Sequence, residues 1–215
     1  EGKALRLKQN YFFVSASMQC IIGDDKKNHY DLKTLPHRVA IQINDTHPAL
    51  AIPEMMRILI DEEGMDWDTA WDITTRTFAY TNHTVMGEAL ERWPQKLFRE
   101  LLPRIHMIVN EINERYCRKL WDHFPGQWKK ISDMAIIAYD EVRMAPLCIV
   151  GSHTVNGVAP LHTSILRNEV FRDYYQLEPY KFINITNGIT QRRWLLKANP
   201  GLAGLLHETI GDDWI

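Results

Sequence analysis

Residues 39–48, VAIQINDTHP, constrain the fold more than any other stretch of the sequence. They begin with a nearly continuous apolar, largely β-branched run, which is typical of a strand buried on both faces of a parallel sheet. The run ends in Asn44, Asp45, Thr46 and His47, and the apolar spacing over residues 49–60 predicts a helix directly afterwards. Because open α/β sheets bind ligands at the carboxyl ends of their strands, Asp45 and His47 are candidate site residues.

The same pattern recurs along the chain. A short β-like run over residues 77–80 is followed by Thr81, Asn82 and His83, with a helix expected to begin near Glu88. Residues 145–150 form a third candidate for a buried strand, followed by His153, and a tight turn is expected at the Asn-Gly pair 156–157. Residues 182–184 form a fourth strand candidate. Histidines after three strands of one sheet would share a pocket.

Helical periodicity fills most of the remaining sequence. Pro103 is expected to break a helix, and Asp66 is expected to cap one. The predicted helices cover residues 3–22, 67–76, 97–102, 104–124, 162–170, 192–197 and 202–210. Residues 23–34 are polar and are expected to form a surface loop. His106 and His123, within the long helix, are expected at the surface. The sequence therefore predicts an α/β fold.

Length and charge exclude several classes of protein. At 215 residues and 45% hydrophobic composition, the chain can bury one large core. A net charge of −2 without a basic cluster argues against nucleic-acid binding, and no apolar run is long enough to cross a membrane. Cys20, Cys117 and Cys148 are far apart, which favours a reducing compartment, and no signal peptide precedes them, so a cytoplasmic location is expected. Because a helix begins without any capping residue, we expect a fragment of a longer chain.

Other chemistries remain open from the residues alone. Each histidine, taken singly, is more often a turn or capping group than a catalytic one. A zinc site of His47, His83 and His153 is conceivable, because three histidines and a water form a known catalytic set, although no helical histidine pair supports it. A hydrolase built on Ser152 is disfavoured, since the glycine that a nucleophile elbow needs two residues later is missing. No glycine-rich nucleotide-binding fingerprint occurs.

Longer motifs carry a resemblance to a known family. The segments VAIQINDTHPALAIPEMMRILIDEEGMDWDTAW, AYTNHTVMGEALERWP, LCIVGSHTVNGVAPLH and FINITNGITQRRWL occur in this order. Together with the helix over residues 2–12, they resemble consecutive parts of the α-glucan (glycogen, starch, maltodextrin) phosphorylases, and the likeness covers nearly all of the chain.

This resemblance implies a fold and a reaction. The fold is the helix-rich part of the amino-terminal, doubly wound (Rossmann-like) half of a glycosyltransferase-B architecture. Residues 1–185 would form the later part of the glucan-binding half, and residues 186–215 the hinge and the start of the cofactor half. The implied reaction is phosphorolysis: orthophosphate attacks the terminal unit of an α-1,4-glucan and releases glucose 1-phosphate with retention, through an oxocarbenium-like transition state. The implied cofactor is pyridoxal 5′-phosphate, acting through its phosphate. Full-length members are usually homodimers.

The resemblance also implies roles for matched residues. His83 resembles the residue whose main-chain carbonyl and ring lie against the glucosyl ring at the point of cleavage, where the carbonyl dipole stabilises positive charge. Asp45 and His47 resemble groups that bind sugar hydroxyls on the acceptor side.

Three further residues match the family's pattern. Val158 resembles the apolar contact to carbon 6 of the glucosyl unit, and Asn187 resembles the amide that binds hydroxyls of that unit. Trp194 resembles the tryptophan near the cofactor, although an ordinary packing role in the hinge is an alternative.

The chain also departs from the family. Gln191 stands where proline is common, and Met86 and Gly87 stand where many members have Leu-Pro. Asn110 replaces an aromatic residue of the glycogen-storage helix, which puts polysaccharide docking there in doubt. The cofactor lysine and the phosphate-binding residues are expected outside residues 1–215. We therefore expect this polypeptide alone to be inactive and to hold no cofactor covalently. The alternative is a non-catalytic glucan-binding module. The sequence does not distinguish glycogen, starch and maltodextrin as the glucan.

Overall fold

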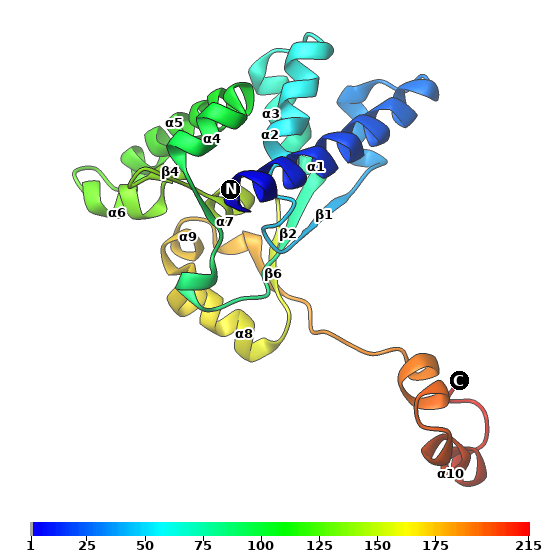
Figure 1. Ribbon diagram of the computed structural model, residues 1–215. Helices are drawn as coiled ribbons and strands as arrows, with labels where there is room; N and C mark the ends of the chain where they lie inside the picture. Colours follow the sequence, from blue (N-terminus) through cyan, green and yellow to red (C-terminus); the bar gives the residue numbers. More distant parts are fainter. Residues whose placement is uncertain (1) are drawn as a thin grey trace. The chain divides into compact units, whose positions relative to one another are not determined.

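A computed structural model describes residues 2–215 of the chain (Figure 1). It divides into two compact units, residues 2–185 and Thr186–Ile215. The first unit contains both sheets and nearly all of the buried core, whereas Ala203 is the buried hydrophobic residue of the second unit. That the two units are a glucan-binding half and the start of a cofactor half stays a prediction.

A four-stranded parallel sheet organises the first unit. Its strands lie in the order β1 (Ile41–Asn44), β2 (Phe78–Thr81), β6 (Val155–Gly157) and β7 (Phe182–Asn184). All three pairings are parallel, so every strand ends at the same edge. A mixed α/β fold with a parallel sheet is thus confirmed.

Strand β1 differs from its prediction of burial on both faces. Ile43 is buried, but Gln42 and Asn44 on the opposite face are exposed. Within residues 2–215, β1 is an outer strand of this sheet and pairs with β2 alone.

The third predicted strand is wrong. Met144–Val150 forms the buried helix α7, and the strand β6 is made of the residues that were expected to form a tight turn. A short, continuously apolar run does not distinguish a buried helix from a buried strand, and Pro146 is well tolerated in the first turn of a helix. As a consequence His153 precedes β6 and lies at the amino end of this strand.

The first helix, α1 (Gly2–Lys27), is longer than predicted. It continues through the first part of the expected loop, and a 3₁₀ turn over Leu32–His37, capped by Asp31, follows after a short break. The extension has a clear cause, because Asp25 is buried and accepts hydrogen bonds from the Arg38 guanidinium at 2.7 and 2.9 Å. The polar sequence therefore indicated a loop, whereas the structure has a helix that a buried ion pair stabilises.

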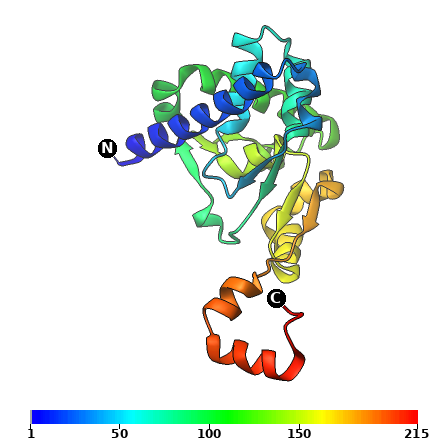
Figure 2. The same ribbon diagram turned by 90° about the vertical axis from the view of Figure 1, so that its right-hand side faces the viewer.

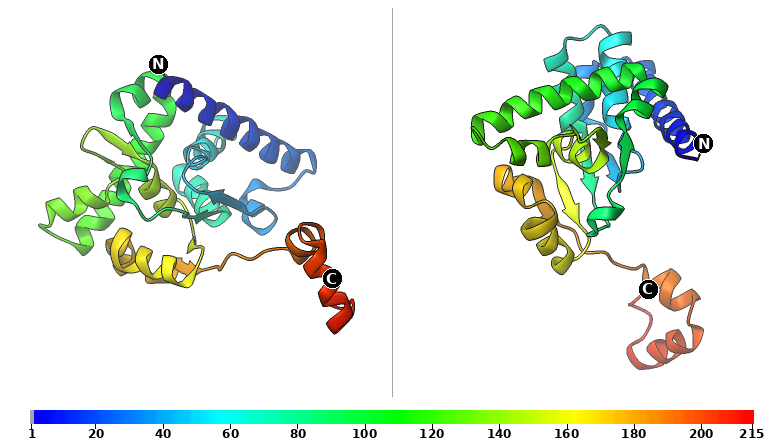
Figure 3. Two further views of the ribbon diagram at one scale, coloured as in Figure 1. Left: turned by 60° about the horizontal axis from the view of Figure 1, so that its bottom comes forward. Right: turned by 60° about the vertical axis from the view of Figure 1, so that its left-hand side comes forward.

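The central helices agree with their predictions. Helix α2 (Ala51–Arg57) continues as a π-helical turn over Ile58–Glu62, and α3 (Trp67–Thr77) begins at Asp66, which accepts a hydrogen bond from the Thr69 N–H at 3.0 Å. Helices α4 (Gln95–Leu101) and α5 (Pro103–His123) are separated at Pro103. Helix α2 contacts α1, α3 and α5 and so lies at the centre of the core. Figure 2 shows α1 along its length, and the right panel of Figure 3 shows α5 along its length.

Two smaller predictions in this region are wrong. The helix expected near Glu88 is replaced by a 3₁₀ turn (Gly87–Ala89) and strand β3 (Arg92–Pro94). The reason is that β3 pairs antiparallel with β5 (Glu141–Arg143). Strand β5 also pairs with β4 (Ile137–Ala138). His106 is buried rather than exposed, with Nε2 3.2 Å from the Gln95 amide, whereas His123 is exposed as predicted.

The remaining helices complete both units. In the first unit these are α6 (Trp128–Met134), α8 (Pro160–Ile165) with a π-helical turn (Leu166–Val170), α9 (Arg172–Leu177) and a 3₁₀ turn (Pro179–Lys181). The second unit has a π-helical segment (Arg192–Lys197) and α10 (Pro200–Ile210), capped by Asn199. Within residues 2–215, no helix combines the length and the apolar character needed to cross a lipid bilayer.

Candidate functional site

The carboxyl ends of the parallel strands form a polar edge. Asn44, Thr81 and Asn156 are register partners on three neighbouring strands. The Gln42 amide donates to Thr81 Oγ1 at 2.8 Å, and Thr81 Oγ1 donates to Asn156 Oδ1 at 2.7 Å. This row of hydrogen bonds fixes the side chains at the strand ends before the chain turns away.

Asp45 reverses the chain at the end of β1. Its φ of +62° lies in the left-handed region, which aspartate tolerates better than most residues. The Asp45 N–H donates to the Thr81 carbonyl at 2.9 Å, and Asp45 Oδ1 accepts from the Thr46 N–H at 2.6 Å. The turn therefore anchors the Asp45 carboxylate beside the end of β2.

His83 lies next to the end of β1. Its Nε2 is 2.5 Å from Asn44 Oδ1, and its side chain is exposed. The preceding Asn82 is fully buried, donates to the Tyr80 hydroxyl at 3.0 Å and accepts from the Thr84 N–H at 3.0 Å. The turn that carries His83 is thus held by Asn82, and its imidazole by Asn44. The structure brings His83 and the residue before Asp45 into contact.

Val158 follows β6 at the same edge. Its N–H donates to His162 Nδ1 at 3.1 Å, which leaves the proton of the neutral imidazole on Nε2. Burial, together with the positive charge that His83 can carry, lowers the pKa of His162. Sequence reasoning missed His162 as part of this edge, although its place in the first turn of the helix after a strand end was the available signal.

Close packing between β6 and α8 holds the turn at Val158. A Cβ atom on Gly157 would lie 2.4 Å from Thr163 Oγ1 and 3.0 Å from the Thr163 Cα. Thr163 Oγ1 also donates to Asn184 Oδ1 at 2.8 Å, which joins α8 to the end of β7. Glycine is therefore required at position 157 for space.

His47 lies further along the turn after β1. It lines an open cavity of about 460 Å³ together with Arg6, Glu91 and Arg92. Thr46 Oγ1 donates to Glu91 Oε2 at 3.2 Å, and burial raises the pKa of Glu91. The sequence did not single out Glu91, because it lies within a segment that was expected to be an ordinary helix.

The other two predicted site residues belong to the second unit. Asn187 is exposed in the segment before the π-helical turn, and Trp194 within that turn is 61% exposed. Their roles stay predictions.

The alternative zinc site is not formed. His47 and His83 follow their strands, but His153 precedes β6 and so lies at the opposite edge of the sheet. Across residues 2–215, no group of three or more histidine, cysteine, aspartate or glutamate residues is arranged to hold a metal ion.

Comparison with known proteins identifies the family. The sequence profile described as Phosphorylase: Carbohydrate phosphorylase matches residues 1–215. This chain belongs to the carbohydrate phosphorylase family. It is 57% identical to the glycogen phosphorylase of Bacillus subtilis, 53% to the muscle form of human glycogen phosphorylase and 51% to the rabbit muscle form.

The chain covers only part of the length of these phosphorylases. Each alignment includes 100% of this chain but only 27% of the relative's length. The chain thus spans about a quarter of the phosphorylases that it matches. The resemblance stated from the motifs is confirmed at the level of the family, and the roles of individual site residues stay predictions.

Proposed function

We propose that this chain is part of an α-glucan phosphorylase, which transfers the terminal glucosyl unit of an α-1,4-glucan to orthophosphate and releases glucose 1-phosphate with retained configuration. The family match over residues 1–215 supports this proposal. The main structural support for this site is the contact of His83 with Asn44. This contact joins the turns after two neighbouring strands, at the edge of the sheet where open α/β folds bind their ligands.

His83 has the central role in this proposal. Its main-chain carbonyl would face the glucosyl carbon that becomes positively charged in the transition state, and a fixed dipole there lowers the barrier without reorganisation. The hydrogen bond from the His83 ring to Asn44 holds the residue in place. The Asp45 carboxylate and the His47 imidazole would bind hydroxyls of the glucan on the acceptor side.

Two further residues would bind the same glucosyl unit. Val158 supplies an apolar contact to carbon 6, and its position is fixed by the hydrogen bond to His162. The Asn187 side chain has a donor and an acceptor, so it can bind two neighbouring sugar hydroxyls.

The proposed cofactor is pyridoxal 5′-phosphate, bound in the full-length protein. Trp194 fits such a group, because the residue is 61% exposed and an indole ring can pack against a planar ring. The cofactor phosphate would supply a group that exchanges a proton with the substrate phosphate. Residues of this chain would bind and orient the sugar, and the His83 carbonyl would stabilise its positive charge. We also propose that the full-length protein is a cytoplasmic homodimer.

Replacing His83 tests the proposal. In the full-length protein, His83→Ala should lower the rate of glucose 1-phosphate release from maltoheptaose by about 100-fold, because small misplacements at the reacting centre cost rates of this order. His123→Ala is the matched control, since His123 is an exposed histidine on α5. Equal rates for both variants would refute the role of the His83 ring in holding this carbonyl in place.

A second experiment separates the proposal from its alternative. We expect the 215-residue chain alone, supplied with pyridoxal phosphate, orthophosphate and glucan, to form no glucose 1-phosphate above the level of its His83→Ala variant. A non-catalytic glucan-binding module would instead retain maltoheptaose binding in the full-length protein without phosphorolysis. Release of glucose 1-phosphate by the full-length protein therefore excludes that alternative.

A further inference from the structure

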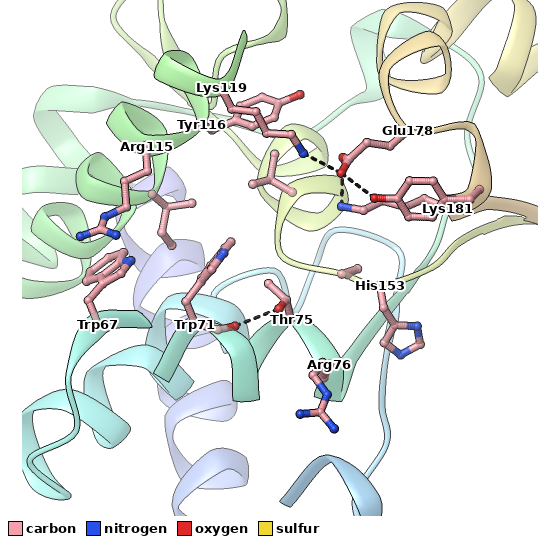
Figure 4. A pocket seen from close by; sticks show the side chains of 14 residues that line it. Trp67, Trp71, Thr75, Arg76, Arg115, Tyr116, Lys119, His153, Glu178 and Lys181 are labelled. Carbon is pink, nitrogen blue, oxygen red and sulfur yellow. Dashed lines mark hydrogen bonds and ion pairs between the residues drawn. The ribbon is translucent and has the colours of Figure 1, made fainter. Parts of the chain in front are cut away.

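A second cavity lies at the opposite edge of the parallel sheet, where β2, β6 and β7 begin (Figure 4). Its volume is about 390 Å³, within the usual range for small-molecule sites. Thr75 and Arg76 precede β2, Ser152 and His153 precede β6, and Lys181 precedes β7. The cavity is thus separate from the strand ends that carry Asp45, His83 and Val158.

Aromatic rings form one side of this cavity. Trp67 and Trp71 come from α3, and Tyr116 comes from the facing side of α5. The guanidinium carbon of Arg115 lies 5.0 Å from the centre of the Trp67 ring. These flat surfaces suit a ligand with a ring, since tryptophan provides a large apolar contact area.

Charged groups form the other side. Glu178 accepts from Lys119 Nζ at 2.7 Å and from the Tyr180 hydroxyl at 2.9 Å, and Lys181 Nζ is 3.1 Å from its second carboxylate oxygen. Figure 4 shows Lys119 and Lys181 meeting at this carboxylate. Two ammonium groups thus face one carboxylate, so the cluster has an excess of positive charge.

The pKa of Glu178 agrees with this excess. Burial alone would raise its pKa, but Lys181 and Lys119 outweigh that effect, and the net result is a pKa below the ordinary value. Burial also lowers the pKa of Lys181, and the Glu178 carboxylate opposes that effect. The guanidinium groups at the cavity are already matched by acids, since Arg76 pairs with Asp72 and Arg115 pairs with Asp68 and Glu111. The lysine cluster is therefore the part of the lining that can bind a further anion.

Two buried polar atoms of the lining lack a partner among residues 2–215. Ser152 is only 1% exposed, and its Oγ makes no hydrogen bond. The indole nitrogen of Trp67 is also buried and unpaired. Buried polar groups are nearly always hydrogen-bonded, and an indole N–H can only donate. A ligand that satisfies Trp67 must therefore present an acceptor.

We propose that this cavity is a binding site for a small anionic molecule with a ring, such as a ring-bearing phosphate monoester, whose anionic group contacts Lys119 and Lys181 and whose ring packs on Trp67 and Trp71. The tryptophan rings suit the ring of such a ligand, and the lysines and unpaired donors suit its anionic group. A cation would be repelled by the lysines. The site is independent of the proposed glucosyl site, because it lies at the other edge of the sheet.

Phenyl phosphate is a suitable probe, because it carries a ring and an anionic group. Inorganic phosphate lacks the ring, and phenyl β-glucoside lacks the charge. We expect ¹⁹F resonances of 5-fluorotryptophan at Trp67 and Trp71, assigned by Trp→Phe variants of the full-length protein, to shift with phenyl phosphate and not with the other two compounds at equal concentration. This readout does not depend on phosphorolysis.

Variants place the binding at this cavity. Lys119→Met should raise the Kd for phenyl phosphate about tenfold, the usual effect of losing one contact to a charged group. Lys129→Met is the matched control, because Lys129 is an exposed, ion-paired lysine on α6 outside the cavity. Ser152→Ala, a change that preserves the fold because it only removes an unpaired hydroxyl, should weaken binding by a smaller factor.

Three outcomes would overturn the proposal. These are unshifted resonances of both tryptophans in the full-length protein, an unchanged Kd in the Lys119→Met variant, and equal shifts with phenyl β-glucoside, which would show a neutral site. Each is distinguishable from a failure of the proposed function, since loss of phosphorolysis in the His83→Ala variant leaves the tryptophan shifts unaffected.

Discussion

A single amide oxygen, Asn44 Oδ1, holds the imidazole of His83 at the end of the neighbouring strand. Asn44→Ala removes this acceptor, and because Asn44 is exposed the fold should tolerate the change. We expect kcat/KM for phosphorolysis by the full-length protein to fall about tenfold, as for loss of one positioning hydrogen bond.

Asn44→Asp is the control for this prediction, since its carboxylate also accepts a hydrogen bond from His83. It should retain most of the activity that Asn44→Ala loses. If both variants lose activity equally, the hydrogen bond does not position His83.

The Glu91 carboxyl predicts a pH dependence of stability. Burial raises its pKa in the folded protein, so the folded state binds its proton more tightly than the unfolded state. Its contribution to stability is therefore largest in acid and is lost as the pH rises from the unfolded pKa of Glu through the raised value.

Glu91→Gln, which does not titrate, checks this directly. In urea unfolding between pH 4 and pH 8, the free energy of unfolding of the unmodified chain should fall relative to the variant as the pH rises. Glu88→Gln, at an exposed position three residues earlier, is the matched control for the loss of one carboxylate. A difference of the opposite sign would show that Glu91 is stabilised as a carboxylate.

Single residues differ in how far the sequence revealed them. Asp45 and His83 could be singled out because each follows an apolar strand directly in the chain. Glu91 could not, because it reaches this edge only through a tertiary contact with Thr46. His162 was missed although it is local, since it bonds to Val158 only four residues earlier in the chain. His153 was misplaced because its position depended on which neighbouring segment forms the strand.

At the scale of elements, the junction of β6 with α8 is the tightest contact near the site. Gly157→Ala would place Cβ against the backbone of Thr163, so we expect the free energy of unfolding to fall by about 1–3 kcal/mol. Equilibrium denaturation of the 215-residue chain measures this change.

Gly23→Ala is the matched control for Gly157→Ala. Gly23 lies within α1, and a Cβ there would meet no atom within 4 Å. This substitution should stabilise the chain by about 0.5–1 kcal/mol, because alanine loses less backbone freedom in a helix. Equal effects of both substitutions would contradict the role of close packing at Gly157.

Elements were predictable where the signal is local. Asp66 and Pro103 mark their helix boundaries through a capping hydrogen bond and a missing N–H, and both boundaries were predicted. The helix over Met144–Val150 was not predicted, because a helix that is buried on all sides has no alternation of apolar and polar residues in its sequence. Strand β3 depends on β5, which lies almost fifty residues away in sequence.

At the scale of the whole molecule, the chain has one large unit and one small unit. A parallel sheet and a large core could be predicted from the apolar strands and from composition. The antiparallel sheet of β3, β4 and β5 could not, since its strands have two or three residues each and leave almost no pattern. The motif resemblance was needed to suggest a boundary near residue 185.

The first residues of the second unit predict where proteases act first. Residues 186–190 lie outside helices and strands, and all five are exposed. Arg192 and Arg193, just beyond them, are exposed in a short π-helical turn that contains no buried residue. Cleavage requires local opening, which is least costly where few apolar contacts are lost.

Trypsin should therefore cut the 215-residue chain first at Arg192 or Arg193 and leave a resistant product that ends there, identified by mass spectrometry. Replacing both arginines with glutamine should delay this first cut, whereas Lys129→Gln, in the first unit, should not. A first cut between residues 2 and 185 would contradict this prediction.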